Sequence, residues 1–298
     1  MKIHRLIQDA GNEYTRLLHN GRTRGVDVGL PKFDAKFSFK RKSTLYIYGP
    51  PYSGKSTFWH FLAVRLAYRH GWKFALYSPE TGEPEDIYAD LTEFYLGKRF
   101  ILDGRFGMTQ KEVDNAMGFI HSHFVVLTDL KTPDDFLQAA DNTADHFEGL
   151  PDCASCDPWN EFYHDMRDHG GRDLYMEYIL GRFREDARLK NRLNTIITHP
   201  QNEDDRIQDN NGVKIHYQPV TRPNRIAGGQ AWARKGLNMM SVWRPPPPDI
   251  DGNVLLRSTG EPYPDGFVSV SIDKVKPREL GEVGKVELIY DFPRRVFV

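Results

Sequence analysis

The residues best suited to chemistry are the nine of GPPYSGKST, which fit the pattern G-x-x-x-x-G-K-[ST]. In this pattern a glycine-rich turn lets successive backbone N–H groups approach phosphate oxygens. Lys55 can reach the β- and γ-phosphates of a nucleoside triphosphate, and the Ser56 hydroxyl can ligate magnesium. We therefore predict a nucleotide-phosphate site formed by Gly49, Pro50, Pro51, Tyr52, Ser53, Gly54, Lys55, Ser56 and Thr57.

Such a loop needs an acidic partner for magnesium, and two aspartates compete for this role. Asp129 ends HFVVLTD, which has the composition of a good strand. Asp157 follows GLPDCAS, which is poor in β-branched residues and makes a weaker strand. The composition of the two segments favours Asp129 and leaves the choice open.

Two further predicted strands end in polar residues. Glu80 ends FALYSPE, and His199 ends NTIITHP. Ligands of open α/β sheets gather at the carboxyl ends of strands, so Glu80 can polarise a water as general base and His199 can sense the γ-phosphate. Taken singly, either residue is more typical of an exposed or structural position.

These motifs require strands and helices that alternate along the chain. STLYIYG predicts a strand that leads into the phosphate loop, and the following helix ends at Gly71 as its C-cap. Further strands and helices alternate as far as LNTIITHP, and the late segments FVSVSIDKVK and KVELIYDF predict an antiparallel pair. The sequence therefore predicts an α/β protein with a mostly parallel sheet, helices on both faces and late antiparallel strands.

Composition limits the possible classes of function. The 298 residues carry a net charge of −1, so any contact with nucleic acid has to come from a local basic patch. The two cysteines, Cys153 and Cys156, are too few for a zinc site and predict buried thiols. The chain has neither a signal-peptide pattern nor a run of apolar residues long enough for a membrane helix, so we expect an intracellular protein.

Six segments in a fixed order resemble the ATPase core of the DnaB family of replicative hexameric helicases. They are GPPYSGKST, LYSPE, DPWN, THPQ, IAGGQAWARK and KVKPRELGEVG. The resemblance covers roughly residues 20–298 and is strongest to the branch of phage primase–helicases and the mitochondrial helicase Twinkle. It implies a RecA-like P-loop domain over residues 26–298, a linker helix within residues 1–25, and a hexameric ring with ATP bound between subunits.

The resemblance also implies roles for single residues. Lys55 and Ser56 would bind phosphate and Mg²⁺, with Asp157 as the acid on the magnesium side. Glu80 would be the catalytic base, and His199 would sense the γ-phosphate and couple it to DNA.

The late segments would serve a neighbouring subunit. Lys274 and Lys276 match a K-x-R pattern whose basic residues reach the neighbour's nucleotide. Because lysine cannot make the planar bidentate contact of arginine, Arg278 is the alternative finger. Tyr290 matches an aromatic residue that stacks on the base.

A polar stretch, residues 201–227, shows no periodicity and predicts a long functional or mobile loop. It carries Arg206 and Tyr217, and acidic residues that are equally typical of a solvated loop. The segment from Gly228 to Lys235 resembles the family's fourth motif, which in the family lies beside the loop of the central channel. We predict contact with single-stranded DNA by Lys214, Arg222, Arg225 and Gly228.

The function predicted from these features is an ATP-driven, ring-forming helicase motor of DNA replication. The alternatives are a RecA-like ATPase that remodels DNA or loads another protein without processive unwinding, and a solitary nucleotide-binding regulator. The expected partners are single-stranded DNA, further copies of the chain and a separate primase or loader, with no membrane. The expected location is the cytoplasm of a bacterium, including that of a phage host.

Overall fold

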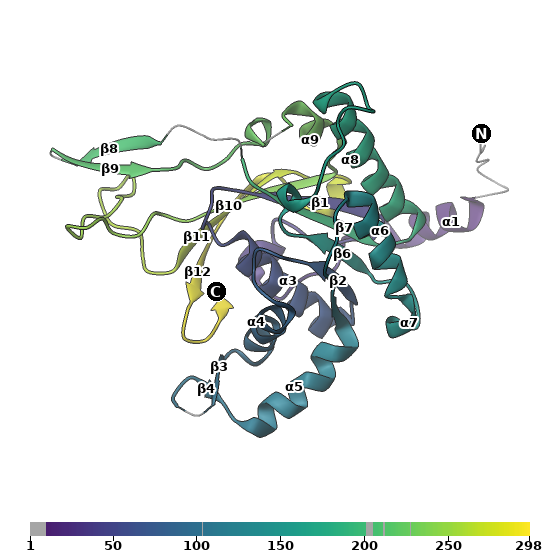
Figure 1. Cartoon of the computed structure of the whole chain (residues 1–298), viewed down its shortest axis with the longest axis horizontal. Helices are drawn as coiled ribbons and strands as arrows, with labels where there is room; N and C mark the ends of the chain where they lie inside the picture. Colours follow the sequence, from purple (N-terminus) through teal and green to yellow (C-terminus); the bar gives the residue numbers. More distant parts are fainter. Residues whose placement is uncertain (1–9, 103, 201–204, 211, 227) are drawn as a thin grey trace.

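The computed structural model describes residues 10–102, 104–200, 205–210, 212–226 and 228–298. The strands of its main sheet are β1 (Ser43–Tyr48), β2 (Phe74–Tyr77), β5 (Phe124–Val126), β6 (Cys153–Cys156), β7 (Leu193–Thr198), β10 (Asn238–Trp243), β11 (Phe267–Lys274), β12 (Gly284–Asp291) and β13 (Val296–Phe297). This sheet has nine strands in the order β13-β12-β11-β10-β1-β7-β6-β2-β5 (Figure 1).

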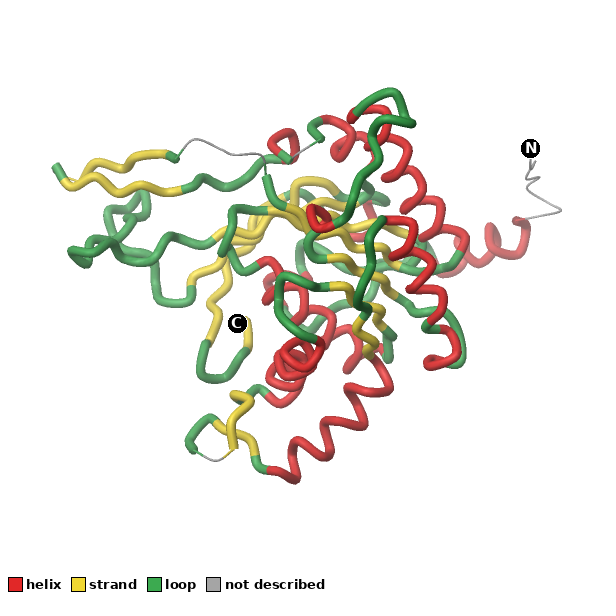
Figure 2. The backbone as a smooth tube through the Cα atoms, viewed as in Figure 1, coloured by secondary structure: helices red, strands yellow, loops and turns green. Residues whose placement is uncertain are grey.

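The remaining elements are helices and two small sheets (Figure 2). The small sheets are β3 (Arg99–Leu102) with β4 (Gly107–Met108), and β8 (Arg206–Asn210) with β9 (Val213–Tyr217). The α-helices are α1 (Gly11–Asn20), α2 (Pro31–Asp34), α3 (Lys55–His70), α4 (Pro84–Leu96), α5 (Gln110–His123), α6 (Pro133–Asn142), α7 (Ala144–Phe147), α8 (Arg172–Leu189) and α9 (Gln230–Lys235). The short 3₁₀ turns are η2 (Trp159–Glu161), η3 (Pro223–Arg225) and η4 (Arg278–Leu280).

Pairing within the main sheet changes from parallel to antiparallel at β10. The strands from β10 through β1, β7, β6 and β2 to β5 are all parallel. The pairs β10–β11, β11–β12 and β12–β13 are antiparallel. The prediction of a mostly parallel sheet with late antiparallel strands is therefore confirmed.

Both faces of the parallel part are covered by helices. Because alternate residues of a strand point to opposite faces, a strand can contribute side chains to two separate cores. On β1, Leu45 and Ile47 join a core with α3 and α4, whereas Tyr46 and Tyr48 join a second core with α6, α8 and α9. All residues of β1, β6 and β7 are buried, as expected for central parallel strands. The predicted two-sided cover is confirmed.

Glycine and capping residues set the ends of the helices that flank the site. α3 starts after Gly54 and ends at Gly71, both in the left-handed conformation that glycine adopts at little cost. The Gly71 amide donates to Ala67 O at 2.8 Å, so the predicted C-cap is confirmed. Thr109 and Thr132 begin α5 and α6 with capping boxes, in which each threonine accepts from a backbone amide of the first turn.

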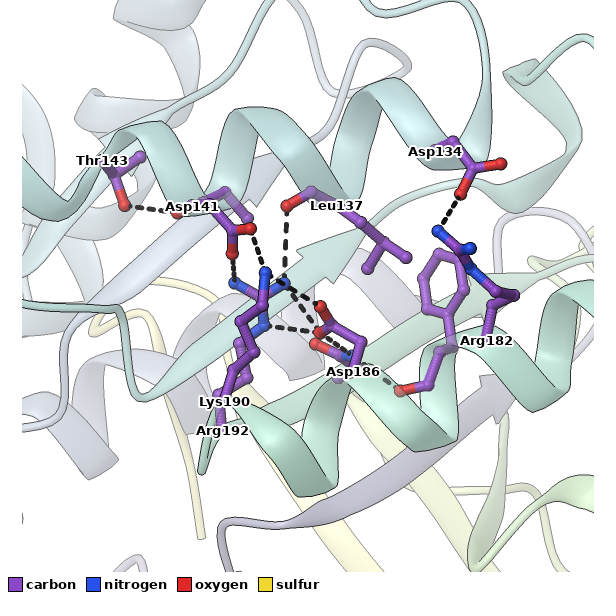
Figure 3. Close-up of polar contacts among 11 residues, drawn as sticks. Asp134, Leu137, Asp141, Thr143, Arg182, Asp186, Lys190 and Arg192 are labelled. Carbon is purple, nitrogen blue, oxygen red and sulfur yellow. Dashed lines mark hydrogen bonds and ion pairs between the residues drawn. The ribbon is translucent and has the colours of Figure 1, made fainter. Parts of the chain in front are cut away.

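A buried ion-pair network ties α6 and α8 to the start of β7 (Figure 3). The fully buried guanidinium of Arg192 donates from Nε to Asp186 Oδ2 at 2.8 Å and from Nη1 to Asp141 Oδ1 at 3.0 Å. Asn194 Nδ2 donates to the same Asp186 oxygen at 2.8 Å, and Lys190 contacts both carboxylates. Because Arg192 directly precedes β7, the network holds the strand that ends at the candidate sensor.

Residues 206–210 and 213–217 correct the prediction of a loop. They form the antiparallel hairpin β8–β9, which projects from the body beside the β10–β11 connection (Figure 1). The sequence of the hairpin lacks the alternation of apolar and polar residues that marks a strand. Ile215, which is paired with Gln208, is the one buried apolar residue among the described residues of the two strands. Residues 201–204 of the predicted loop lie outside the described residues.

The described part of the predicted linker helix is α1, Gly11–Asn20, and residues 1–9 lie outside the described part of the chain. α1 leaves Tyr14, Leu17 and Leu18 exposed and points away from the body (Figure 1). Residues 133–147 form two successive helices, α6 and α7. The break falls at Thr143, whose hydroxyl donates to Ala140 O at 2.8 Å and competes with the helix ladder.

The two cysteines are free and buried, as predicted. Cys153 packs in the core on one face of the sheet and Cys156 in the core on the other face. The C-x-x-C spacing on a strand therefore separates the two thiols. Over the part of the chain that the structure describes, no helix has the length and apolarity to span a membrane.

Candidate nucleotide site

The phosphate loop connects β1 to α3. It contains two glycines, and a different structural requirement explains the absence of a side chain at each of them. A Cβ at Gly49 would lie 2.1 Å from the carbonyl oxygen of Val242 on β10, so no side chain fits there. Gly54 supplies the left-handed turn from which α3 starts. Between them Tyr52 points into solvent at a positive φ of 59°. The backbone thus turns tightly while the helix N-terminus faces the loop, which is the arrangement that binds phosphate.

Lys55 lies inside the loop and contacts its backbone. Its Nζ donates to Gly49 O at 3.1 Å and Pro50 O at 2.9 Å. Burial lowers the pKa of Lys55 to about 8, and the negative charges of Asp157 and Glu80 oppose that shift. A buried cation whose own partners are carbonyl oxygens is available for the oxygens of a phosphate.

Asp157 follows β6 and is only 3% exposed. Burial raises its pKa to about 6, against hydrogen bonds from Ser56 and Ser78 and the charge of Lys55. Its Oδ2 has no hydrogen-bond partner among the described residues. A hydroxyl and an under-coordinated carboxylate in contact are donors that fit magnesium, which takes few protein ligands beside phosphate oxygens. No larger group of histidine, cysteine or acidic side chains suited to a metal occurs among the described residues.

Asp129 does not join this group. It follows β5, the edge strand of the sheet, in a turn with a positive φ of 59°. β5 is separated from β6 by β2, and from β1 by three strands.

Glu80 and His199 follow β2 and β7 and contact each other. His199 Nε2 lies 3.2 Å from Glu80 Oε2, in a contact open to solvent. Burial lowers the pKa of His199, with a further lowering from the charge of Lys55, while Glu80 raises it. A neutral imidazole that donates to the candidate base can hold this base in place beside the phosphate loop.

Asn160 was not predicted as a site residue. Its Oδ1 accepts from Thr198 Oγ1 at 3.0 Å and from the amide of His199 at 3.4 Å. It therefore links the segment after Asp157 to the end of β7. The only signal in the sequence is its place in DPWN, three residues beyond the acid.

A cavity of about 380 Å³ opens beside the phosphate loop. Ser53 and Thr57 line one side, and Tyr290 at the end of β12 lines another with Phe292. The two rings pack edge to face with centroids 4.7 Å apart. The proline run, residues 245–248, is also part of the wall. An aromatic cavity of this size beside a phosphate loop suits a nucleobase.

The candidate finger residues lie at the opposite end of the strands, where the parallel strands begin. β11 runs antiparallel to β10, so Lys274 is paired with Met239 near the start of β10. The Lys276 amide donates to Asn238 Oδ1 at 3.0 Å, and Asn238 contacts the first residues of β1. Lys276 and Arg278 are exposed. These residues are therefore remote from the phosphate loop of their own chain.

The candidate DNA residues are spread along residues 214–228. Lys214 lies on β9, Arg222 and Arg225 are exposed beside η3, and Gly228 is buried before α9. A Cβ at Gly228 would approach Trp232 Nε1 at 3.1 Å and Met176 at 3.2 Å, which explains the small residue.

Two solved structures share this fold. A DnaB-like replicative helicase, described with its interactions with primase, matches 98% of this chain and 68% of its own length, with a TM-score of 0.71 and 16% identity. The ATPase domain of a phage helicase matches over 100% of this chain and 99% of its own length, with a TM-score of 0.72 and 15% identity. No family model and no curated protein matches the sequence.

The fold is therefore that of the ATPase domains of DnaB-like replicative helicases. The RecA-like architecture expected from the six ordered segments is confirmed. At these identities the similarity concerns the fold, and the activity has to be argued from the site.

Proposed function

We propose that this chain is the ATP-hydrolysing motor of a ring-forming DNA helicase. One observation carries the proposal: a phosphate loop, a buried acid and a base–histidine pair lie at the carboxyl ends of the parallel strands, while Lys274, Lys276 and Arg278 lie at the opposite end of these strands. A site divided in this way is complete only when a second copy of the chain supplies its cations.

Within one subunit, the loop amides and Lys55 would hold the phosphates of ATP. Ser56 and Asp157 would hold Mg²⁺, which neutralises charge on the β- and γ-phosphates when bound. Glu80 would polarise the attacking water, and its contact with His199 supports a role for the histidine as a sensor of the γ-phosphate. Tyr290 would pack against the base.

Across the subunit interface, Lys276 or Arg278 would stabilise charge that develops on the neighbour's γ-phosphate, with Lys274 nearby. Arg278 has the planar geometry that a bidentate contact needs. The exposed apolar side of α1 supports a further contact between copies, as expected of a linker helix within residues 1–25 that precedes the ATPase domain of residues 26–298. A hexamer is the proposed assembly.

Single-stranded DNA is the proposed track, contacted by Lys214, Arg222, Arg225 and the backbone at Gly228. A few basic residues suffice when a ring repeats them around a strand. A separate primase or loader is a further proposed partner, and the cytoplasm of a bacterium or phage host is the proposed location.

The test measures ATP hydrolysis with and without single-stranded DNA, and displacement of a strand from a forked duplex. We expect DNA to stimulate hydrolysis and ATP to drive displacement. Lys55→Ala should abolish both, whereas Lys111→Ala, which removes an exposed lysine of α5, should change neither. Stimulated hydrolysis without displacement would instead indicate a remodelling or loading ATPase. A rate of ATP hydrolysis that is the same with and without single-stranded DNA would refute both the helicase and the DNA-remodelling or loading ATPase.

A further inference from the structure

A second cavity, of about 410 Å³, lies between the β8–β9 hairpin and the late strands. We call it the hairpin pocket; its lining includes Arg206, Tyr217, Thr221, Arg222, Tyr263 and Lys285. We propose that the hairpin pocket binds one nucleotide unit of single-stranded DNA, with its phosphate on the arginines and its base against the tyrosines. The proposal rests on the proposed function and extends it from Arg222, already assigned to DNA, to a pocket that adds Arg206 and Tyr217.

The pocket is preformed because the hairpin is docked on the β10–β11 connection. Gln208 accepts from the Leu256 amide at 2.7 Å and donates to its carbonyl at 2.9 Å, as a neighbouring strand would do. Ile215 is buried in a small core with Trp243 and Leu255. Trp243 Nε1 donates to Gln218 O at 2.8 Å and fixes the chain that leaves the hairpin. A site built in this way does not have to be ordered by its ligand.

The charge of the pocket favours an anion. Arg206 and Arg222 come from different elements, and neither has an ion-pair partner among the described residues. Lys285 is neutralised in part by Glu287 at 2.8 Å. Among the described residues, Asp273 is the one carboxylate in the lining, and it accepts a hydrogen bond from Tyr48. The two free guanidiniums therefore dominate, and they match the geometry of a phosphate.

The remaining lining suits a base. Tyr217 and Tyr263 are both partly exposed in the pocket. The guanidinium of Arg257 lies over the Tyr263 ring, 5.5 Å from its centroid, so Tyr217 is the main ring on which a base can stack. Thr221 is 1% exposed, and its Oγ1 has no hydrogen-bond partner among the described residues. A buried hydroxyl without a partner needs one, which a base edge or a phosphate oxygen would supply.

The pocket also has a suitable position. Thr221 and Arg222 start the segment that continues to Arg225 and Gly228, so a strand held by this segment passes the mouth of the pocket. Leu255 and Tyr263 line both this pocket and the cavity beside the phosphate loop. The two cavities therefore share a wall, so a ligand bound in one cavity can change the affinity of the other cavity for its ligand.

The experiment compares two strands of equal length, oligothymidine and an abasic strand with the same phosphates, by fluorescence anisotropy with a non-hydrolysable ATP analogue present. Arg206→Ala should weaken both strands about fivefold or more and reduce the dependence of affinity on salt. Tyr217→Leu keeps apolar bulk but removes the ring, so it should weaken oligothymidine about fivefold or more and leave the abasic strand unchanged. Arg188→Ala removes an exposed arginine of α8 and is the charge control.

The outcomes separate the two levels of the argument. If the unmodified protein binds neither strand, the proposed function fails. If it binds both, and Arg206→Ala and Tyr217→Leu bind as Arg188→Ala does, only the hairpin pocket is refuted. Equal losses for the two strands in Tyr217→Leu would also refute it, because the ring would then act on the fold and not on a base. Unfolding midpoints of all three variants should match that of the unmodified protein.

Discussion

The two charged groups at the centre of the site, Lys55 and Asp157, predict how nucleotide affinity depends on pH. Burial lowers the pKa of Lys55 to about 8 and raises that of Asp157 to about 6. Phosphate binding needs the lysine charged, and magnesium binding needs the carboxylate ionised. Affinity should therefore be highest between these two values and fall on both sides, with protonation of Asp157 on the acid side and deprotonation of Lys55 on the alkaline side.

The magnitude follows from the fraction of protein in the competent state. At about pH 5 only roughly one tenth of Asp157 is ionised, so the apparent Kd should rise about tenfold, or about 1.4 kcal/mol. At about pH 9 roughly one tenth of Lys55 remains protonated, and the loss is again about tenfold. The assay is calorimetric binding of a non-hydrolysable ATP analogue with Mg²⁺ at constant ionic strength.

Two variants separate the protein's titration from that of the nucleotide, whose phosphate has its own pKa near about 6. Asp157→Asn should remove the part of the affinity loss at acid pH that comes from the protein and leave the part that comes from the nucleotide. Because Asp157 raises the pKa of Lys55, it should also move the alkaline loss to lower pH. Lys55→Gln should abolish the alkaline loss and move the acid loss to higher pH. Nucleotide affinity that does not change between about pH 5 and about pH 9 would refute the interaction between Lys55 and Asp157. So would acid and alkaline losses of affinity that occur at the same pH in the variants as in the unmodified protein.

Three further predictions concern other contacts. Asp157→Asn should reduce ATP turnover by about a hundredfold or more, whereas Asp129→Asn should leave turnover unchanged; steady-state hydrolysis decides, and equal effects would contradict the site. Arg192→Met strands buried carboxylates and should lower the unfolding free energy by about 3 kcal/mol, with most of it recovered in Arg192→Met/Asp186→Leu; additive losses in urea denaturation would show that the pair is not coupled. Tyr48→Phe removes the hydroxyl that joins the floor of the hairpin pocket to β1, so stimulation of hydrolysis by DNA should fall more than basal turnover; parallel losses would mean that the bond only stabilises the fold.

The sequence predicted most of the parallel sheet because its strands are apolar and its helices are amphipathic. β6 was the weak prediction, since Cys-Ala-Ser-Cys lacks the β-branched residues that mark strands. In the structure this strand lies between β2 and β7 and is buried on both faces. In such a position small side chains leave room for the large rings that pack around them, so volume matters more than β propensity.

The hairpin pocket was beyond sequence reasoning for another physical reason. Hydrophobic alternation reveals a strand only when one face rests on an apolar core. The inner face of β8 carries Arg206, Gln208 and Asn210, and it rests on a loop through polar bonds.

The choice between Asp129 and Asp157 depends on strand order, which chain order does not give. The order β1-β7-β6-β2-β5 places β6 two strand spacings from β1, or about 10 Å, and β5 four spacings away, or about 19 Å. Two oxygens that share a magnesium ion lie within about 4.2 Å of each other, since each ligand distance is about 2.1 Å. A helix that starts above β1 can bring Ser56 over the end of β6, and Asp157 is in hydrogen-bond contact with it. No side chain spans the distance to β5, so the better-looking strand positions Asp129 too far from the phosphate loop to share a magnesium ion with Ser56.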